Sequence, residues 1–264
     1  MVDLLDETAI IASLSPSTQS WLRILRVFQE IGSTNTALLE HAAAEPVDGV
    51  VFCAEQQTEG RGRRGRTWVS PPGKNIAMSI GHAFDRSPSR LGGLSLVVGL
   101  AVIDALSATG VNGLELKWPN DVLLSGRKAG GILVELANAV APVNVVIGIG
   151  LNVGGGAEVS GRVDQPVADL LEACPGLSRN RATSALIDAV HDFCRIFESE
   201  GFAPMRDAWT RMHALQDRAV DISIGDRRET GRVVGVTEHG ALVVEERGQR
   251  RELLAGEVSV RVAS

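Results

Sequence analysis

The sequence has little that would bind nucleic acid through bulk charge. Its 264 residues carry 26 Lys and Arg against 32 Asp and Glu, a formal net charge of −6, so the molecule as a whole does not attract polyanions. Aromatic residues make up 4% and tyrosine is absent, so the aromatic platforms typical of single-strand binding are not indicated. Any anion site must therefore come from a local cluster of basic residues.

Cysteine and long apolar runs are also scarce. The three cysteines are far apart, and none of the five histidines lies at metal-ligand spacing, so we expect reduced thiols and no metal held by the protein. The apolar stretch at residues 91–106 is interrupted by three glycines, a serine and Asp104, which indicates a packed helix rather than a membrane span. The acidic first eleven residues are not typical of a secretory signal. These features favour a cytoplasmic protein.

The order of patterns along the chain predicts a mixed α+β domain, residues 1–216, followed by a small domain, residues 217–264. Strands are predicted at residues 21–30, 49–54, 75–80, 114–118, 131–136 and 143–151. Helices are predicted at residues 36–44, 91–109 and 181–200. Short alternating segments joined by Gly-Asp, His-Gly and Arg-Gly turns follow at residues 220–224, 231–237, 241–246 and 250–254. Such segments are typical of a small β barrel of SH3-like type.

The stretch from Gly60 to Arg66 reads GRGRRGR, inside a polar segment at residues 55–74 that has no helix or strand period. It matches G-x-G-x-x-G, but Pro71 and Pro72 follow where a dinucleotide-binding fold needs a helix. Gly73-Lys74 precedes Asn75 instead of Ser or Thr, which excludes a P-loop. Glycines allow close approach of a ligand to the backbone, and the four guanidinium groups suit carboxylate and phosphate oxygens. On spacing alone, a solvated basic loop or a nucleic-acid patch is an alternative.

Three further motifs place polar side chains beside predicted strands. The first motif follows a strand and reads Lys117-Trp118-Pro119-Asn120-Asp121. The second precedes a strand and reads Lys128-Ala129-Gly130-Gly131. The third is GIGLN at residues 148–152, which ends in an amide. Each motif is weak alone, because a lone lysine is usually a solvated cation and an isolated Asn is often a turn residue. Together they supply two lysines, a carboxylate and two amides, with glycines where a ligand could lie against the backbone.

Taken in order, these motifs resemble the motif set of the biotin–protein ligases, together with Ser33-Thr34-Asn35 and Gln57. The likeness is close over about residues 30–155 and looser towards the C-terminus, where that family carries an SH3-like barrel. It implies a mixed-sheet catalytic domain of the biotin/lipoate ligase type. It also implies a two-step reaction, in which biotin and ATP give biotinyl-AMP and pyrophosphate, with Mg²⁺ bound to the nucleotide. A lysine of a biotin carboxyl carrier protein or domain then takes the biotinyl group.

The resemblance also implies roles for individual residues. Because the biotin carboxylate is already ionised at pH 7, the first step needs positive charge and oriented donors rather than a base. The expected catalytic residues are Lys128, bridging the biotin carboxylate and the α-phosphate, with Arg63, Lys117 and, as a base in the transfer step, Asp121. The expected biotin-binding residues are Ser33, Thr34, Asn35, Gln57, Arg61, Gly62, Arg63, Lys128 and Gly131. The expected adenylate-binding residues are Arg61, Arg63, Arg64, Trp68, Lys117, Asn120, Lys128 and Asn152. Trp68 either covers the adenylate or is simply packed.

Two other functions fit parts of the sequence. A lipoate or octanoate transferase shares the general fold and a related carrier lysine, although octanoyl transfer from a carrier uses no ATP. A nucleic-acid-binding module would use the arginine loop, but the negative net charge counts against it. Some biotin ligases carry an N-terminal DNA-binding domain of about sixty residues or more, and the early position of Ser33 leaves little room for three helices and a wing. We therefore expect a monofunctional form, a monomer or weak homodimer, that binds neither nucleic acid nor membrane.

Overall fold

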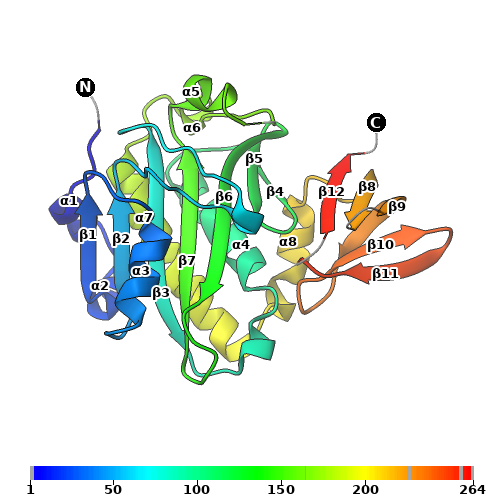
Figure 1. Ribbon diagram of the computed structural model, residues 1–264, viewed down its shortest axis with the longest axis horizontal. Coiled ribbons are helices and arrows are strands. Elements are labelled where there is room, and N and C mark those ends of the chain that lie inside the picture. Colours follow the sequence, from blue (N-terminus) through cyan, green and yellow to red (C-terminus); the bar gives the residue numbers. More distant parts are fainter. Residues whose placement is uncertain (1–2, 164, 225–226, 256–257, 263–264) are drawn as a thin grey trace.

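A seven-stranded mixed sheet forms the centre of the computed structural model, which describes residues 3–163, 165–224, 227–255 and 258–262. The strand order is β1-β2-β3-β7-β6-β5-β4 (Figure 1). The bounds are β1 Ile24–Phe28, β2 Val50–Ala54, β3 Asn75–Phe84, β4 Leu114–Lys117, β5 Asp121–Leu124, β6 Arg127–Leu136 and β7 Val143–Asn152. β1 and β2 are parallel, and the other neighbours are antiparallel. The predicted mixed sheet is thereby confirmed.

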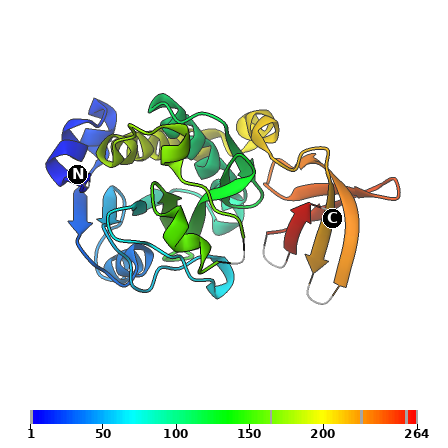
Figure 2. The same cartoon turned by 90° about the horizontal axis from the view of Figure 1, so that it is seen from above.

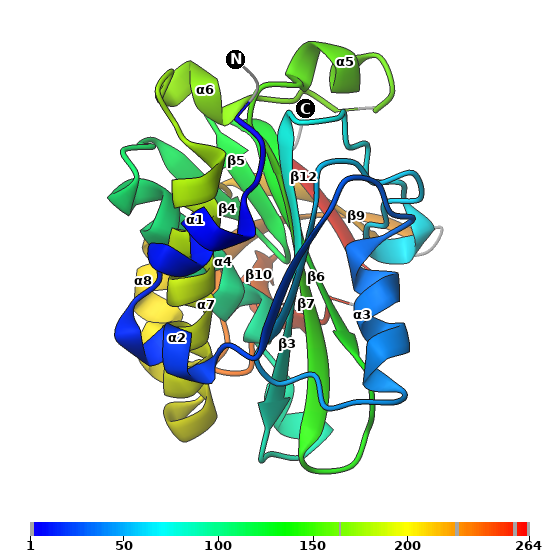
Figure 3. The ribbon, with the colours of Figure 1, turned by 90° about the vertical axis from the view of Figure 1, so that its left-hand side faces the viewer.

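Helices cover both faces of this sheet (Figure 3). One face carries α1 Glu7–Ala12, α2 Pro16–Trp21, α4 Leu94–Ala108 and α7 Arg179–Glu200, and the other carries α3 Thr34–Ala42. Shorter elements are α5 Gly156–Ser160, α6 Leu170–Ala173, α8 Arg206–Met212, η1 Arg63–Gly65, η2 Pro88–Leu91 and η3 Ala203–Met205. The stretch Pro88–Ala108 is long and apolar enough to cross a membrane, but 61% of its most apolar window is buried inside the protein. It packs on α7 and β6, as expected for a core helix.

A second, five-stranded antiparallel sheet follows α8, in the order β11-β10-β9-β8-β12 (Figure 2). Its strands are β8 Ala219–Ile224, β9 Arg227–Val236, β10 Leu242–Glu246, β11 Gln249–Leu253 and β12 Val258–Val262. The SH3-like module predicted from the alternating segments is confirmed, although β12 was not predicted. The expected turn at residues 225–226 lies outside the described residues.

Two sequence-based boundaries were wrong. The strand predicted to begin at Trp21 begins at Ile24, because α2 runs from Pro16 to Trp21. Lys128 was predicted to lie on a loop, but it lies inside β6, which already starts at Arg127. The glycines after it suggested a loop, yet Gly130 is required by close packing of strands: a Cβ there would lie 2.4 Å from Leu151 Cδ2. A glycine run can thus mark a tightly packed strand.

The linker after α8 fixes the Lys117–Asp121 motif at the junction of the two sheets. The Ala214 N–H donates to the Leu116 carbonyl at 2.8 Å, and His213 Nε2 accepts from the Trp118 backbone N–H at 3.3 Å. The Trp118 indole N–H donates to the Gly240 carbonyl at 3.0 Å. The backbone and the indole of Trp118 therefore have partners in both parts of the protein.

The buried ring of His213 predicts a pH dependence of stability. Burial, and then the nearby charge of Lys117, lower its pKa to about 3. The unfolded chain takes up a proton below about pH 6.5 while the folded protein does not, so the free energy of unfolding should fall from pH 6.5 towards pH 3, by up to about 1.4 kcal/mol per pH unit. His213→Gln keeps an acceptor for the Trp118 N–H, and its free energy of unfolding should lack this pH-dependent contribution. Urea unfolding at pH 7 and pH 5 measures it, and an equal pH dependence in both proteins would contradict it.

Candidate functional site

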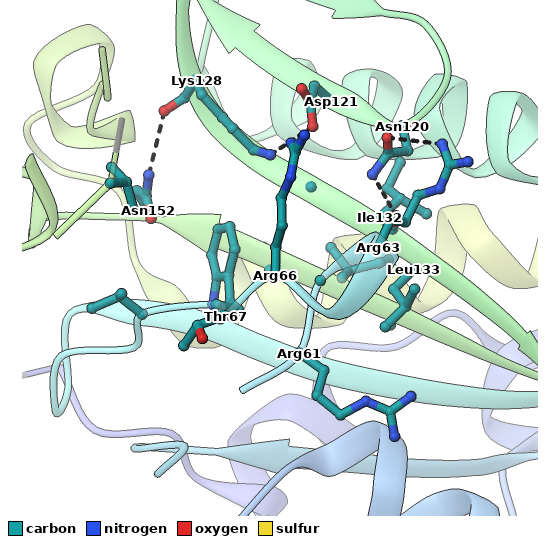
Figure 4. Close-up of a pocket in the computed structure, with 18 of the residues that line it drawn as sticks. Arg61, Arg63, Arg66, Thr67, Asn120, Asp121, Lys128, Ile132, Leu133 and Asn152 are labelled. Atoms are coloured by element: carbon teal, nitrogen blue, oxygen red, sulfur yellow. Dashed lines mark hydrogen bonds and ion pairs between the residues drawn. The ribbon is translucent and has the colours of Figure 1, made fainter. Parts of the chain in front are cut away.

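A cavity of about 700 Å³ lies between the loop after β2, the N-terminus of α3 and strands β5, β6 and β7 (Figure 4). Every residue that the sequence predicted for the site lines it: Ser33, Thr34, Asn35, Gln57, Arg61, Gly62, Arg63, Arg64, Trp68, Lys117, Asn120, Asp121, Lys128, Gly131 and Asn152. These residues come from segments more than 100 positions apart, and the sheet brings them together. Their individual roles remain predictions.

The cavity also has lining residues for which the sequence predicted no individual role. Arg66 and Thr67 continue the arginine loop, and apolar contacts come from β3, β6 and β7, namely Met78, Ile132, Leu133 and Ile149. A segment after β7 contributes Val159, Arg162, Val163, Gln165, Pro166 and Val167. The alternating side-chain pattern of β6 could have indicated that Ile132 lines the cavity. The segment at 159–167 carries no motif, so the sequence gave no local signal for it.

Lys128 and Asp121 form an ion pair on the cavity wall. Lys128 Nζ lies 2.6 Å from Asp121 Oδ1, and their side chains are 17% and 18% exposed. Asp121 begins β5, and a register shift in the β5–β6 pairing follows at Val122/Leu123. A Cβ at Gly131 would lie 3.5 Å from Lys128 Nζ, so this glycine leaves room beside the ammonium. The pair places one oriented cation where a ligand carboxylate or phosphate can reach it.

The arginine loop folds into a hairpin beside the cavity. The Gly62 N–H donates to the Arg66 carbonyl at 2.7 Å, and the Trp68 N–H donates to the Gly60 carbonyl at 2.8 Å. At the tip, Arg64 and Gly65 have φ of 59° and 69°. This left-handed conformation is readily adopted by glycine and costs other residues about 1–2 kcal/mol.

Two of the loop arginines are held by acceptors of the protein itself. Arg63 donates to Asn120 Oδ1 at 3.2 Å and to the carbonyl of Ala255, in the turn after β11. Its burial, followed by the nearby charge of Arg64, lowers its pKa. Arg61 pairs with Glu135 and donates to Thr36 Oγ1 at 3.2 Å. Arg66 extends from the loop toward Asp121 (Figure 4).

A hydrogen-bonded polar wall closes the end of the cavity next to α3. Ser33 caps this helix, its hydroxyl accepting from the Thr36 N–H at 3.4 Å. Gln57 Oε1 accepts from the Thr34 N–H at 2.8 Å. Behind them lies Ser79 of β3, which is fully buried, with Oγ 2.7 Å from Thr34 Oγ1 and 2.5 Å from Asn35 Oδ1. This wall offers the hydroxyl and amide groups that would match a urea.

Trp68 and Asn152 each present a buried polar atom without a hydrogen-bond partner in the described part of the chain. Trp68 lies against β7, where a Cβ at Gly150 would be 2.6 Å from its ring, and its Nε1 has no acceptor. Asn152 donates through Nδ2 to the Lys128 carbonyl at 3.3 Å, whereas its Oδ1 has no donor. Because buried polar groups rarely stay unpaired, both atoms fit ligand contacts.

The cluster of arginines predicts a loop that a ligand orders. Four guanidinium groups on one short loop repel one another, and a bound anionic ligand would offset this repulsion. Cleavage by trypsin near Arg63 or Arg66 should therefore be fast in the free protein and at least several-fold slower with biotin and ATP. Cleavage elsewhere in the chain serves as the internal control, and equal rates near these arginines in both conditions would contradict the expectation.

Comparisons with known proteins found matches over both parts of the chain. Residues 27–152 match the model of the Biotin/lipoate A/B protein ligase family, and residues 217–261 match that of the Biotin protein ligase C terminal domain. The chain is 36% identical to the Biotin--[acetyl-CoA-carboxylase] ligase of Mycobacterium tuberculosis, over 96% of this chain and 95% of that one. It is 37% identical to the Bifunctional ligase/repressor BirA of Escherichia coli, over 90% of this chain and 74% of that one.

A solved structure shows the same architecture. The biotin protein ligase from Aquifex aeolicus in complex with biotin and ATP superposes with a TM-score of 0.79 at 27% identity, covering 92% of this chain and 100% of that one. The fold and the site thus define an enzyme of the biotin/lipoate A/B protein ligase family, to which this chain belongs. Within that family, the C-terminal match and the curated relatives place it among the biotin protein ligases.

Proposed function

We propose that this protein activates biotin with ATP and transfers it to a lysine of a biotin carboxyl carrier protein or domain. The observation that carries the proposal is the single cavity in which the polar wall around Thr34 and Gln57 meets the Lys128–Asp121 pair and the arginine loop. A urea-matching wall, a half-buried cation and guanidinium groups in one space fit a ligand with a neutral polar head and an anionic tail.

In the first step, the biotin carboxylate oxygen attacks the α-phosphorus of ATP, and the bond to the β-phosphate oxygen breaks to release pyrophosphate. Both reactants are anions, so the main obstacle is charge. Lys128 lies on the cavity wall with its ammonium oriented by Asp121, where it would bridge the carboxylate and the α-phosphate. Lys117 and the loop arginines would neutralise the remaining phosphate charge.

In the second step, the carrier lysine amine attacks the acyl carbon of biotinyl-AMP, and AMP leaves. The amine must lose a proton, and Asp121 is our proposed base. Its Oδ1 is held by Lys128 at 2.6 Å, so Oδ2 is the oxygen left to accept that proton. The three cysteines are free, which agrees with our proposal that the enzyme acts in a reducing cytoplasm.

Mg²⁺ would enter with the nucleotide. Among the described residues that line the cavity, Asp121 is the only carboxylate, and it is already paired with Lys128. Phosphate oxygens would therefore hold the ion, with Asp121 as the one carboxylate among those described residues, as is usual for Mg²⁺ in nucleotide sites. When bound, the ion would offset charge on the leaving pyrophosphate.

The experiment that tests the proposal is ATP–pyrophosphate exchange with purified protein and Mg²⁺, in parallel reactions with biotin, lipoate or octanoate. We expect exchange with biotin only. Exchange that depends on lipoate would identify a lipoate ligase instead. No exchange with any of the three acids would contradict the proposed adenylation.

Arg63→Gly should release the intermediate from the site. Arg63 holds the loop to Asn120 and to the turn after β11, and loss of charge-assisted bonds should raise the off-rate of biotinyl-AMP by about one to two powers of ten. The free adenylate would then label bystander lysines. The measurement is biotin on serum albumin, blotted after incubation with biotin and ATP.

Arg247→Gly is the matched control, because Arg247 is exposed, lies in the turn between β10 and β11 and already has φ of 50°. It should label albumin no more than wild type does. If Arg63→Gly still made adenylate but labelled albumin no more than wild type, Arg63 would not retain the intermediate.

A further inference from the structure

Glu135 lies on β6 beside the cavity, and the proposed reaction gives it no role. Its carboxylate joins two parts of the site: Oε1 accepts from Arg61 of the arginine loop, and Oε2 accepts from the Asn35 amide at 2.9 Å. The Glu135 side chain is 22% exposed, so this double contact is partly shielded from water. One carboxylate therefore forms hydrogen bonds both to the arginine loop and to the N-terminal turn of α3.

The side chain of Asn35 has a fixed partner at each end. It is 4% exposed, and a Cβ at Gly148 would lie 2.3 Å from its Oδ1, so the amide is confined against β7. A carboxylate can only accept hydrogen bonds, so the nitrogen of the amide must face Glu135, and its oxygen then faces Ser79.

The hydrogen bonds of Asn35 continue into the polar wall. Ser79 has one hydroxyl proton, and Asn35 Oδ1, which can only accept, lies 2.5 Å away. Ser79 Oγ also lies 2.7 Å from Thr34 Oγ1, and the Thr34 hydroxyl donates to Gln57 Oε1 at 3.1 Å. Glu135 is thus linked through Asn35 and Ser79 to the Thr34 and Gln57 side chains of the polar wall.

Arg61 is directed to the same end of the cavity. Its guanidinium bonds to Glu135 and to Thr36, at the start of α3. Figure 4 shows it pointing away from Lys128 and Asp121, where the phosphates would lie. Loss of Glu135 should therefore disturb the wall that would contact the biotin head, and leave the phosphate end in place.

We infer that Glu135 is a positioning residue that acts through Asn35 and Arg61 and thereby sets the affinity of the site for biotin. The inference rests on the proposed function. It differs from a role in general stability, because a destabilised enzyme has a smaller active fraction and a lower apparent kcat with an unchanged KM.

The test is steady-state ATP–pyrophosphate exchange, with biotin varied at saturating ATP and ATP varied at saturating biotin. For Glu135→Ala we expect the KM for biotin to rise about tenfold, as for loss of one ordinary hydrogen-bonded contact. The kcat and the KM for ATP should stay within about twofold of wild type. Glu135→Gln keeps an acceptor for Asn35 but loses the ion pair, so its KM for biotin should be intermediate.

A double-mutant cycle and a control complete the test. Arg61→Ala in the Glu135→Ala background should raise the KM for biotin less than Arg61→Ala does alone, since the two residues act as a pair. Glu229→Gln, which removes a comparable ion pair with Arg251 in the C-terminal sheet, should behave as wild type.

An unchanged KM for biotin in Glu135→Ala, a lower kcat with that KM unchanged, or additive effects in the cycle would each overturn the inference and leave the proposed function standing. Absence of biotin-dependent exchange in the wild type would overturn both.

Discussion

Lys128→Ala should reduce the kcat/KM of biotin-dependent pyrophosphate exchange by about 100-fold or more, the usual effect of removing one group that stabilises transition-state charge. Lys128 lies on β6 with its ammonium 2.6 Å from Asp121. Loss of the lysine also leaves Asp121 as a negative charge facing two anionic substrates. Exchange of labelled pyrophosphate into ATP measures the effect.

Lys74→Ala is the matched control for this prediction. Lys74 pairs with Glu158 at the surface, with its side chain 44% exposed, and it is not among the residues that line the cavity. Its loss should change exchange by less than about twofold, as is typical of exposed ion pairs. Near-normal exchange by Lys128→Ala would move the bridging role to Lys117.

Arg179→Met should lower the free energy of unfolding by about 3–5 kcal/mol, because it leaves a buried carboxylate without its cation. Arg179 begins α7 and is 2% exposed. It pairs with Glu55 at 2.8 Å and donates to the Asn75 carbonyl at 3.0 and 2.8 Å. Glu55 and Asn75 lie on either side of the segment at residues 56–74, which contains the arginine loop. The same change should therefore also make this segment less ordered. Urea denaturation measures the loss of stability.

Arg232→Met is the control, because its ion pair with Asp217 is exposed on both sides, at 61% and 64%. Arg232→Met should lower the free energy of unfolding by less than about 1 kcal/mol. The double variant Arg179→Met/Glu55→Gln should recover part of the loss, since it removes the unpaired charge. A cost below 1 kcal/mol for Arg179→Met would contradict the importance of the buried pair.

The sequence predicted the site well because its motifs combine side chains of defined chemistry with glycines. GRGRRGR and the lysine motifs each have a local composition that few structural roles require, and all their predicted residues line one cavity. The strands of the large sheet were also predictable, since runs such as residues 49–54 and 143–151 are continuous and apolar.

What the sequence could not predict depends on contacts between distant segments. Ser79 is an ordinary strand residue in the sequence and Glu135 had no predicted role, and only the sheet places them against Asn35. The partner of Arg63 in the turn after β11, Ala255, is 192 positions away. The glycines near Lys128 predicted a loop, but the chain there is strand β6, and Gly130 is needed because β7 packs closely against it. The domain boundary at residues 216/217 stays a prediction.

The most direct test of the central claim is intact-mass measurement of a purified biotin carboxyl carrier domain after incubation with this protein, biotin, ATP and Mg²⁺. We predict that one biotinyl group is added at a single lysine, that addition requires ATP, and that the carrier with this lysine changed to arginine stays unmodified. An unmodified carrier under the full reaction conditions, or the same addition without ATP, would contradict the account.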